Sequence, residues 1–331
     1  MQKPHKHKHS APEAQNRPLL SPGVVTAAAA LAGAGLALGA LAYTYLAIHP
    51  PRRRIRRTPA ELGLDYEDIA FPSRDGLQIR GWLIPAPAGE ETKAVVVLCH
   101  GYPTNRVEML PYVRMLHEAG YATLLFDFRA LGESEGDLCS IGHYEVEDLR
   151  GALDYLQSRP DTRALPYGAL GLSLGGAVSL MTAAEDARLR AVVAEASYPS
   201  LQHAIEARCR FVAGPFAKTV VRSLHKVARR WIDFHPGDVA PLEVIGRISP
   251  RAVLLIQGQR DPQVRWRDAV RMYEAAGEPR EIWLLPRSGH ARCLRDAPQE
   301  YACRVTAFFQ KYLTYPPRGC ATPLPKGKGV E

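Results

Sequence analysis

The chain has 331 residues, of which 46% are hydrophobic and 23% charged, a composition typical of a globular protein with a buried core. Its net charge of +8 arises entirely within residues 1–57, which hold nine Lys or Arg and one acid, Glu13. The charges of the remaining 274 residues sum to zero. This disfavours a nucleic-acid enzyme, which would carry its positive charge on the folded domain.

The six cysteines form no C-x-x-C pair, and a chain of this length does not need disulfides to be stable. We therefore expect free thiols in a reducing compartment. A bridge between Cys293 and Cys303 remains open, because sequence alone does not decide pairing.

The N-terminal region is predicted to hold a disordered, basic and His-rich tail (residues 1–23), followed by residues 24–48 without any charge. A helix of this length spans about 37 Å, which exceeds a bilayer core of about 30 Å. We expect a transmembrane anchor. A signal peptide cleaved after the A-x-A motif at residues 40–42 and a soluble Ala-rich helix are the alternatives.

A basic linker is predicted over residues 49–64. Arginines crowd its start, and positive charge favours the cytoplasmic side of a membrane. The sequence therefore predicts a single-pass membrane protein whose catalytic domain is cytoplasmic. These arginines are Arg52, Arg53, Arg54, Arg56 and Arg57.

From residue 65 onward, short apolar runs alternate with helical patterns. An Asp-Gly pair at residues 75–76 predicts a hairpin turn, and the later alternation predicts βαβ crossovers. The fold class is thus α/β, with a mostly parallel sheet covered by helices on both faces. The predicted strands are 69–72, 77–85, 94–99, 123–128, 167–172, 190–196, 253–258 and 281–286, and the predicted helices are 106–119, 144–158, 174–184, 264–276 and 298–312.

Residues 198–249 are too long for one crossover and are interpreted as a helical cap inserted in a domain spanning residues 65–313. Its segment 208–230 has seven basic residues and no acid. This pattern is typical of a solvated helix face. Contact with an anionic membrane surface is the alternative. Residues 314–331, rich in Pro and Gly, are expected to be disordered.

The strongest local motif is G-L-S-L-G at residues 171–175, which matches G-x-S-x-G between a predicted strand and a predicted helix. Such a turn exposes the serine hydroxyl, and glycines two residues to either side avoid a clash with neighbouring backbone. Ser173 is therefore the predicted nucleophile.

A serine nucleophile needs a base, and proteins with this motif place an acid and then a histidine later in the chain. Asp261 follows strand 253–258 and His290 follows strand 281–286, so both lie at the same sheet edge as Ser173. We expect Asp261 to orient His290. Glu195, at the end of strand 190–196, is the one competing acid.

The oxyanion of an acyl-transfer intermediate needs backbone N–H donors. We expect these from Leu174, the residue after the nucleophile, and from Tyr102, in the loop after strand 94–99. His100 is expected to brace that loop and not to act as a base.

Together, the segments HGYPTNR, DFRALGES, GLSLGG, GQRDPQV and RSGH resemble the α/β-hydrolase superfamily, in its small-cap branch of serine aminopeptidase-like and membrane-anchored hydrolases. The resemblance covers residues 65–313 and implies the triad Ser173, Asp261 and His290, with no cofactor and no metal. Ala130 departs from the family pattern, which often has glycine at this turn.

The sequence thus predicts a serine hydrolase that cleaves a carboxylic ester or thioester, with an acyl or lipid-like substrate and no nucleic-acid partner. The alternatives are a serine peptidase acting on short peptides and a non-catalytic binding protein built on a hydrolase fold.

Overall fold

The computed structural model describes residues 22–89, 91–214, 218, 221, 222, 229 and 233–313. The chain divides after Tyr43 into two compact units, Met1–Tyr43 and Thr44–Glu331. The second unit contains the sheet and every predicted site residue.

A single sheet of eight strands organises this second unit, in the order β1-β2-β4-β3-β5-β6-β7-β8. Strand β2 pairs antiparallel with both β1 and β4, and the remaining pairs are parallel. The predicted mostly parallel sheet with an antiparallel edge is confirmed. The strands are β1 (Glu67–Pro72), β2 (Gln78–Ile84), β3 (Val95–Cys99), β4 (Ala122–Phe126), β5 (Tyr167–Leu172), β6 (Leu189–Glu195), β7 (Ala252–Gly258) and β8 (Arg280–Leu285).

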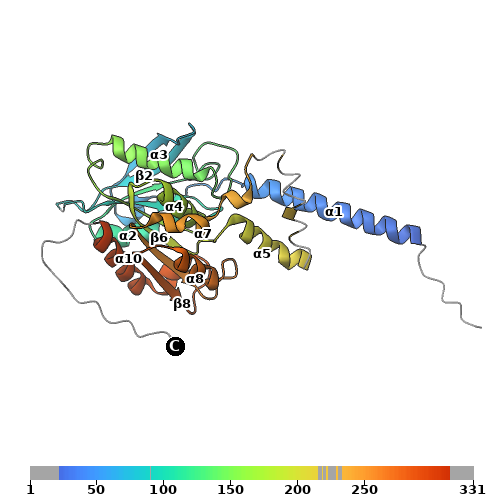
Figure 1. The fold of residues 1–331 in the computed structure, drawn as a ribbon. Helices are drawn as coiled ribbons and strands as arrows, with labels where there is room; N and C mark the ends of the chain where they lie inside the picture. The colour runs from blue at the N-terminus through green and yellow to red at the C-terminus, as the bar shows by residue number, and fades with distance from the viewer. Residues whose placement is uncertain are drawn as a thin grey trace, which may run out of the picture. The chain divides into compact units, whose positions relative to one another are not determined.

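Helices cover both faces of this sheet (Figure 1). Side chains from α3, α4 and α8 pack into one apolar cluster, and those from α2 and α10 pack into another on the opposite face. The helices are α1 (Pro22–Ile48), α2 (Leu110–Glu118), α3 (Glu145–Ser158), α4 (Leu174–Glu185), α5 (Leu201–Ala213), α7 (Pro241–Val244), α8 (Trp266–Ala275), α9 (Cys293–Asp296) and α10 (Pro298–Leu313), with 3₁₀ turns η1 (Pro59–Leu62), η2 (Arg106–Met109), η4 (Pro236–Asp238) and η5 (Ile245–Ile248).

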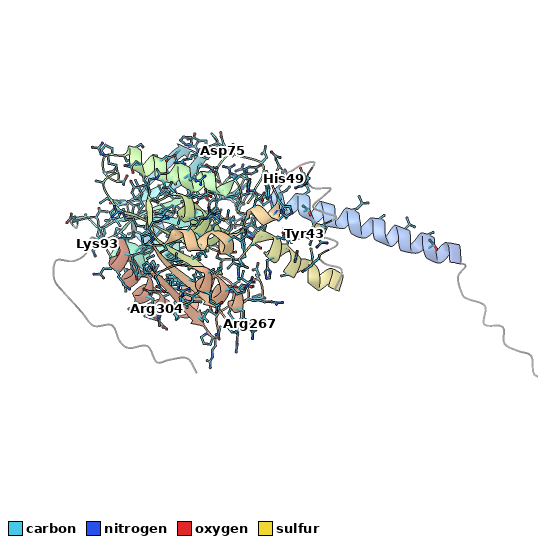
Figure 2. All side chains as sticks on the ribbon, viewed as in Figure 1. Tyr43, His49, Asp75, Lys93, Arg267 and Arg304 are labelled. Atoms are coloured by element: carbon cyan, nitrogen blue, oxygen red, sulfur yellow. The ribbon has the colours of Figure 1, made fainter. Side chains whose placement is uncertain are left out.

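Alternation of side chains along the strands divides the core. Along β3, Val95 and Val97 belong to the first cluster, whereas Val96 and Leu98 belong to the second. Charged side chains such as Lys93 and Arg304 lie at the outer surface (Figure 2). The sheet is therefore buried on both faces, as its continuous apolar runs predicted.

One predicted helix differs. Residues 106–119 form the 3₁₀ turn η2 and then α2, not a single helix. Pro111 is the physical reason, because it has no N–H to donate and is tolerated only in the first turn of a helix.

Helix α1 covers the predicted transmembrane anchor, residues 24–48. Among the residues that the structure describes, however, no helix combines the length and the hydropathy that crossing a membrane requires. The helix is present, and its prediction as a membrane anchor is not supported.

The segment that follows α1 is bound to the sheet domain, although the sequence suggested a linker at residues 49–64. Ile48 is buried and its carbonyl accepts a 2.8 Å hydrogen bond from the Cys139 amide. The Arg52 guanidinium donates to the carbonyls of Ser134 and, at 2.7 Å, of Gly136. We call residues 47–53 the strap.

The predicted cap region begins with α5 and ends with η4, α7 and η5. Within the predicted helical cap, most of residues 215–232 lie outside the described residues, as do residues 1–21 and 314–331. Cys293 and Cys303 both carry free thiols, so no bridge joins them.

Candidate active site

Ser173 occupies the sharp turn between β5 and α4. Its backbone has φ 50° and ψ −107°, a strained conformation for a residue with a side chain. A Cβ on Gly171 would overlap the backbone of Gly175, and one on Gly175 would overlap the Cys99 carbonyl. The two motif glycines are therefore required by backbone approach.

The side chains of Ser173, His290 and Asp261 form one hydrogen-bonded row. Ser173 Oγ lies 3.1 Å from His290 Nε2, and His290 Nδ1 lies 2.7 Å from Asp261 Oδ2. The three residues come from the ends of β5, β8 and β7, as parallel strands place them at one edge. The imidazole is oriented so that Nε2 can take the serine proton.

The Asp261 carboxylate is buried and well supplied with donors. Its Oδ1 accepts from the amides of Gln263, at 2.7 Å, and Val264, at 3.0 Å. Burial alone would raise the pKa of this carboxyl, but His290 and these amides outweigh burial and lower the pKa below its usual 3.8. Asp261 is therefore ionised at neutral pH.

Sequence reasoning missed Gln257, which holds this carboxylate from the other side. Its Nε2 donates to Asp261 Oδ2 at 2.9 Å and to the Val264 carbonyl at 3.2 Å. The available signal was a polar residue at the end of the otherwise apolar run VLLIQG, where the side chain is fully buried.

The loop after β3 lies against the nucleophile, since a Cβ on Gly101 would stand 3.7 Å from Ser173 Cβ. The Gly101 amide donates to Glu108 Oε2 at 2.7 Å, so this carboxylate already uses the Gly101 donor. The predicted donor Tyr102 follows in the same loop. Leu174, the other predicted donor, is the first residue of α4, where amides have no partner within the helix.

His100 is buried behind this loop and makes the contacts expected of a brace. Its Nε2 accepts from the Phe128 amide at 3.0 Å, which leaves Nδ1–H to donate to the Gly101 carbonyl at 2.8 Å. Burial lowers the pKa of His100, so the ring is neutral. It has no hydrogen bond to Ser173 among the described residues.

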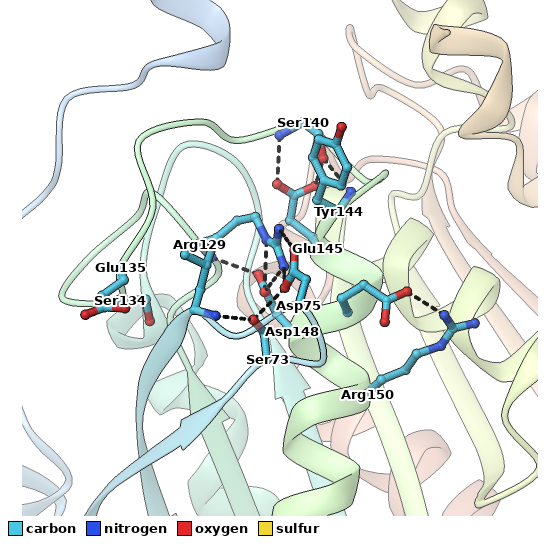
Figure 3. Close-up of polar contacts among 12 residues, drawn as sticks. Ser73, Asp75, Arg129, Ser134, Glu135, Ser140, Tyr144, Glu145, Asp148 and Arg150 are labelled. Atoms are coloured by element: carbon cyan, nitrogen blue, oxygen red, sulfur yellow. Dashed lines mark hydrogen bonds and ion pairs between the residues drawn. The ribbon is translucent and has the colours of Figure 1, made fainter. Parts of the chain in front are cut away.

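The loop after β4 is held by Arg129 (Figure 3). The guanidinium of Arg129 donates to Asp75, in the turn between β1 and β2, and to Asp148 in α3, with distances of 2.6–2.9 Å. Ala130, the departure from the family pattern, has φ 60°. This left-handed backbone explains why glycine is suited to that turn.

Apolar side chains gather beside the triad. Ala177, one turn after Ser173, and Val264, three residues after Asp261, share a buried cluster with the strap residue Ile48. The other buried members are Tyr198, Leu201, Phe234 and Val239. Apolar residues of one cluster therefore follow both Ser173 and Asp261 in the chain.

Glu195, the competing acid, is not the partner of His290 in the structure. Its carboxylate accepts a 2.9 Å hydrogen bond from the Cys293 amide instead. The structure thus brings Asp261 to the histidine.

This chain is similar to a protein family, to two curated proteins and to a solved structure. Residues 90–239 match a family model described as serine aminopeptidase, S33. The uncharacterized protein YfhR of Salmonella typhi is 28% identical over 73% of this chain and 79% of its own length, and a polyketide transferase from a Penicillium species is 23% identical over 76% and 98%. An esterase structure from Pyrococcus furiosus superposes with a TM-score of 0.67 at 25% identity, covering 80% of this chain and 98% of the esterase.

Proposed function

Because this chain belongs to the α/β-hydrolase superfamily, we propose that it is a serine hydrolase that cleaves carboxylic esters or thioesters through an acyl-enzyme. The observation that carries the proposal is the row of Ser173, His290 and Asp261 at hydrogen-bonding distances. The esterase from Pyrococcus furiosus supports the ester as substrate class.

In the proposed reaction, Ser173 Oγ attacks the carbonyl carbon while His290 Nε2 takes its proton. The amides of Tyr102 and Leu174 stabilise the oxyanion, and the ionised Asp261 stabilises the imidazolium. His290 then protonates the leaving alkoxide or thiolate, and an acyl group stays on Ser173. Water, deprotonated by His290, releases the acid and restores the serine.

We propose an acyl or lipid-like substrate. The support is that Ala177 and Val264, which follow Ser173 and Asp261 by four and three residues, belong to an apolar cluster with Ile48, and apolar groups suit an alkyl chain. A panel of p-nitrophenyl esters and acyl thioesters of increasing chain length should show kcat/KM rising with chain length. A preference for acetate would contradict this substrate class.

The function is tested by labelling the full chain with a fluorophosphonate, which reacts with activated serines. Wild type should label, and Ser173→Ala and His290→Ala should not. Ser179→Ala, six residues along α4, and His203→Ala, on α5, remove a serine and a histidine outside the row and should label like wild type. A folded wild-type protein that does not react with the fluorophosphonate would contradict the proposal and favour a non-catalytic binding protein.

A serine peptidase is the second candidate, and the family model described as serine aminopeptidase favours it. Aminoacyl p-nitroanilides separate the two functions. Turnover of these amides at a kcat/KM equal to that of the matching esters would favour the peptidase.

We also propose that the N-terminal segment attaches the protein to a membrane, with the catalytic unit on the cytoplasmic side. The charge-free run 24–48 followed by the arginine cluster supports this. In alkaline carbonate extraction of expressing cells, the full chain should stay with membranes and residues 44–331 should be released. Release of both would contradict the anchor.

A further inference from the structure

Glu195 contacts both the nucleophile turn and the loop of the base. We propose that Glu195 is a positioning residue, whose backbone carbonyl fixes Ser173 and whose carboxylate fixes the loop that carries His290. This inference rests on the proposed function.

The first contact is made by the backbone. Glu195 is the last residue of β6 and pairs in register with Leu172, the residue before the nucleophile. Its carbonyl accepts a 2.8 Å hydrogen bond from the Ser173 amide. The strained turn is thereby attached to β6, the parallel neighbour of β5, beyond the point where β5 itself ends.

The second contact is made by the side chain. Glu195 Oε1 accepts a 2.9 Å hydrogen bond from the amide of Cys293, three residues after His290 and the first residue of α9. The same loop has a second tie, in which Ser288 Oγ donates to Asp296 Oδ2 at 2.8 Å. The His290 loop is thus held on both sides of the histidine.

The surroundings of this carboxylate argue for a specific role. Glu195 is fully buried, and the polar groups facing it are the Cys293 amide and thiol and the phenols of Tyr112 and Tyr301. Tyr112 Oη lies 3.4 Å from Oε2, and Tyr301 Oη makes no hydrogen bond of normal geometry within the described part of the chain. Burial raises the pKa of this carboxyl. No cation faces this carboxylate among the residues that the structure describes. An acid buried in this way costs folding free energy, which an apolar side chain would not.

The geometric consequence concerns the 3.1 Å separation of Ser173 Oγ and His290 Nε2. One atom is placed through the Glu195 carbonyl and the other through the Glu195 carboxylate, so a shift of either contact changes that separation. Misplacement by about 1 Å can lower a rate about 100-fold. Glu195 acts on this separation without touching substrate.

The test compares three substitutions in the full chain, assayed with p-nitrophenyl butyrate and by the rate of fluorophosphonate labelling. Glu195→Gln keeps an oxygen that accepts from Cys293 and should retain kcat within about threefold. Glu195→Leu removes the acceptor at similar volume and should lower kcat and the labelling rate by about 10-fold to 100-fold, with KM within twofold. Tyr112→Phe leaves the Cys293 contact in place and should match wild type.

Glu195→Asp shortens the side chain by one methylene and so moves the carboxylate away from the Cys293 amide. This variant replaces Glu195→Leu in the test if the Leu variant does not fold. It should lower kcat at least fivefold at unchanged KM. Wild-type kcat in a folded Leu or Asp variant would overturn the inference, and so would a Gln variant as slow as the Leu variant. If the wild-type protein does not react with the fluorophosphonate, the proposed function is overturned instead. The two failures are therefore distinguishable.

Discussion

Tyr102 Oη donates a 2.7 Å hydrogen bond to the backbone carbonyl of Ala47. The loop that carries a predicted oxyanion donor is therefore attached to the strap, more than fifty residues earlier in the chain. Asn105, at the end of the same loop, adds a 2.9 Å hydrogen bond to the Arg53 carbonyl. The strap is thus bonded to the loop that follows β3 at two points.

Tyr102→Phe should lower kcat by about threefold to tenfold while the backbone N–H stays in the chain, because the loop loses its tie to Ala47 and the donor is less well placed. Steady-state ester hydrolysis measures this. Tyr155→Phe removes a hydroxyl on α3, far along the chain from the site loops, and is the control. Equal kcat in wild type and Tyr102→Phe would show that the tie is not needed.

Two truncated chains should distinguish the contribution of helix α1 to activity from that of the strap. A chain of residues 44–331, which starts at the boundary between the two units, should keep the activity of the full chain. Residues 58–331 lack Ile48, Arg52 and Arg53, so we expect at least a tenfold loss of activity or of soluble protein. Activity of the shorter chain equal to that of the longer one would contradict a structural role for the strap.

Asp261→Asn should lower kcat by about a thousandfold or more, because an amide cannot stabilise the imidazolium and favours the wrong tautomer. Asp268→Asn, on α8, changes another buried aspartate whose ion-pair partners are His203 and Arg271, and should leave kcat near wild type. Hydrolysis rates at saturating ester test this. If Asp268→Asn also lowers kcat strongly, the loss in Asp261→Asn cannot be assigned to the triad, because substitution of another buried aspartate has the same effect.

The same aspartate predicts a dependence of stability on pH. Its pKa in the folded protein lies below the unfolded value of 3.8. Its ionisation therefore stabilises the fold above that pH, and the contribution is lost as pH falls through the folded pKa. In urea unfolding from pH 5 to pH 2, wild type should lose free energy of unfolding relative to Asp261→Asn as pH falls through the folded pKa of Asp261. A constant difference throughout would contradict the lowered pKa.

Arg129→Met should destabilise the protein by about 3 to 5 kcal/mol, because it leaves the fully buried Asp148 without its cation. Thermal and urea unfolding measure the change. The matched control is Arg304→Met, whose ion pair with Glu300 is half exposed on α10, and it should cost less than about 1 kcal/mol. Similar losses in both variants would exclude a special role for the buried pair.

The sequence by itself determined the sheet and the row of candidate catalytic residues, because both depend on patterns within short segments of the chain. Apolar runs of strand length recur between helical patterns, and Ser173, Asp261 and His290 each follow such a run directly. Parallel strands bring their carboxyl ends to one edge, so three local positions become one site. The glycines at 171 and 175 were predicted for the same reason, since the turn itself demands them.

Only the tertiary structure decided which distant groups support that site. Gln257 contacts Asp261 because a buried strand end faces the next loop, and Glu195 contacts Cys293 across 98 positions of sequence. The strap looked like a linker because its arginines are polar, yet its backbone carbonyls accept hydrogen bonds that no residue pattern records. Such contacts depend on how loops far apart in the chain meet in space, and this packing is decided by the whole core and not by any one segment.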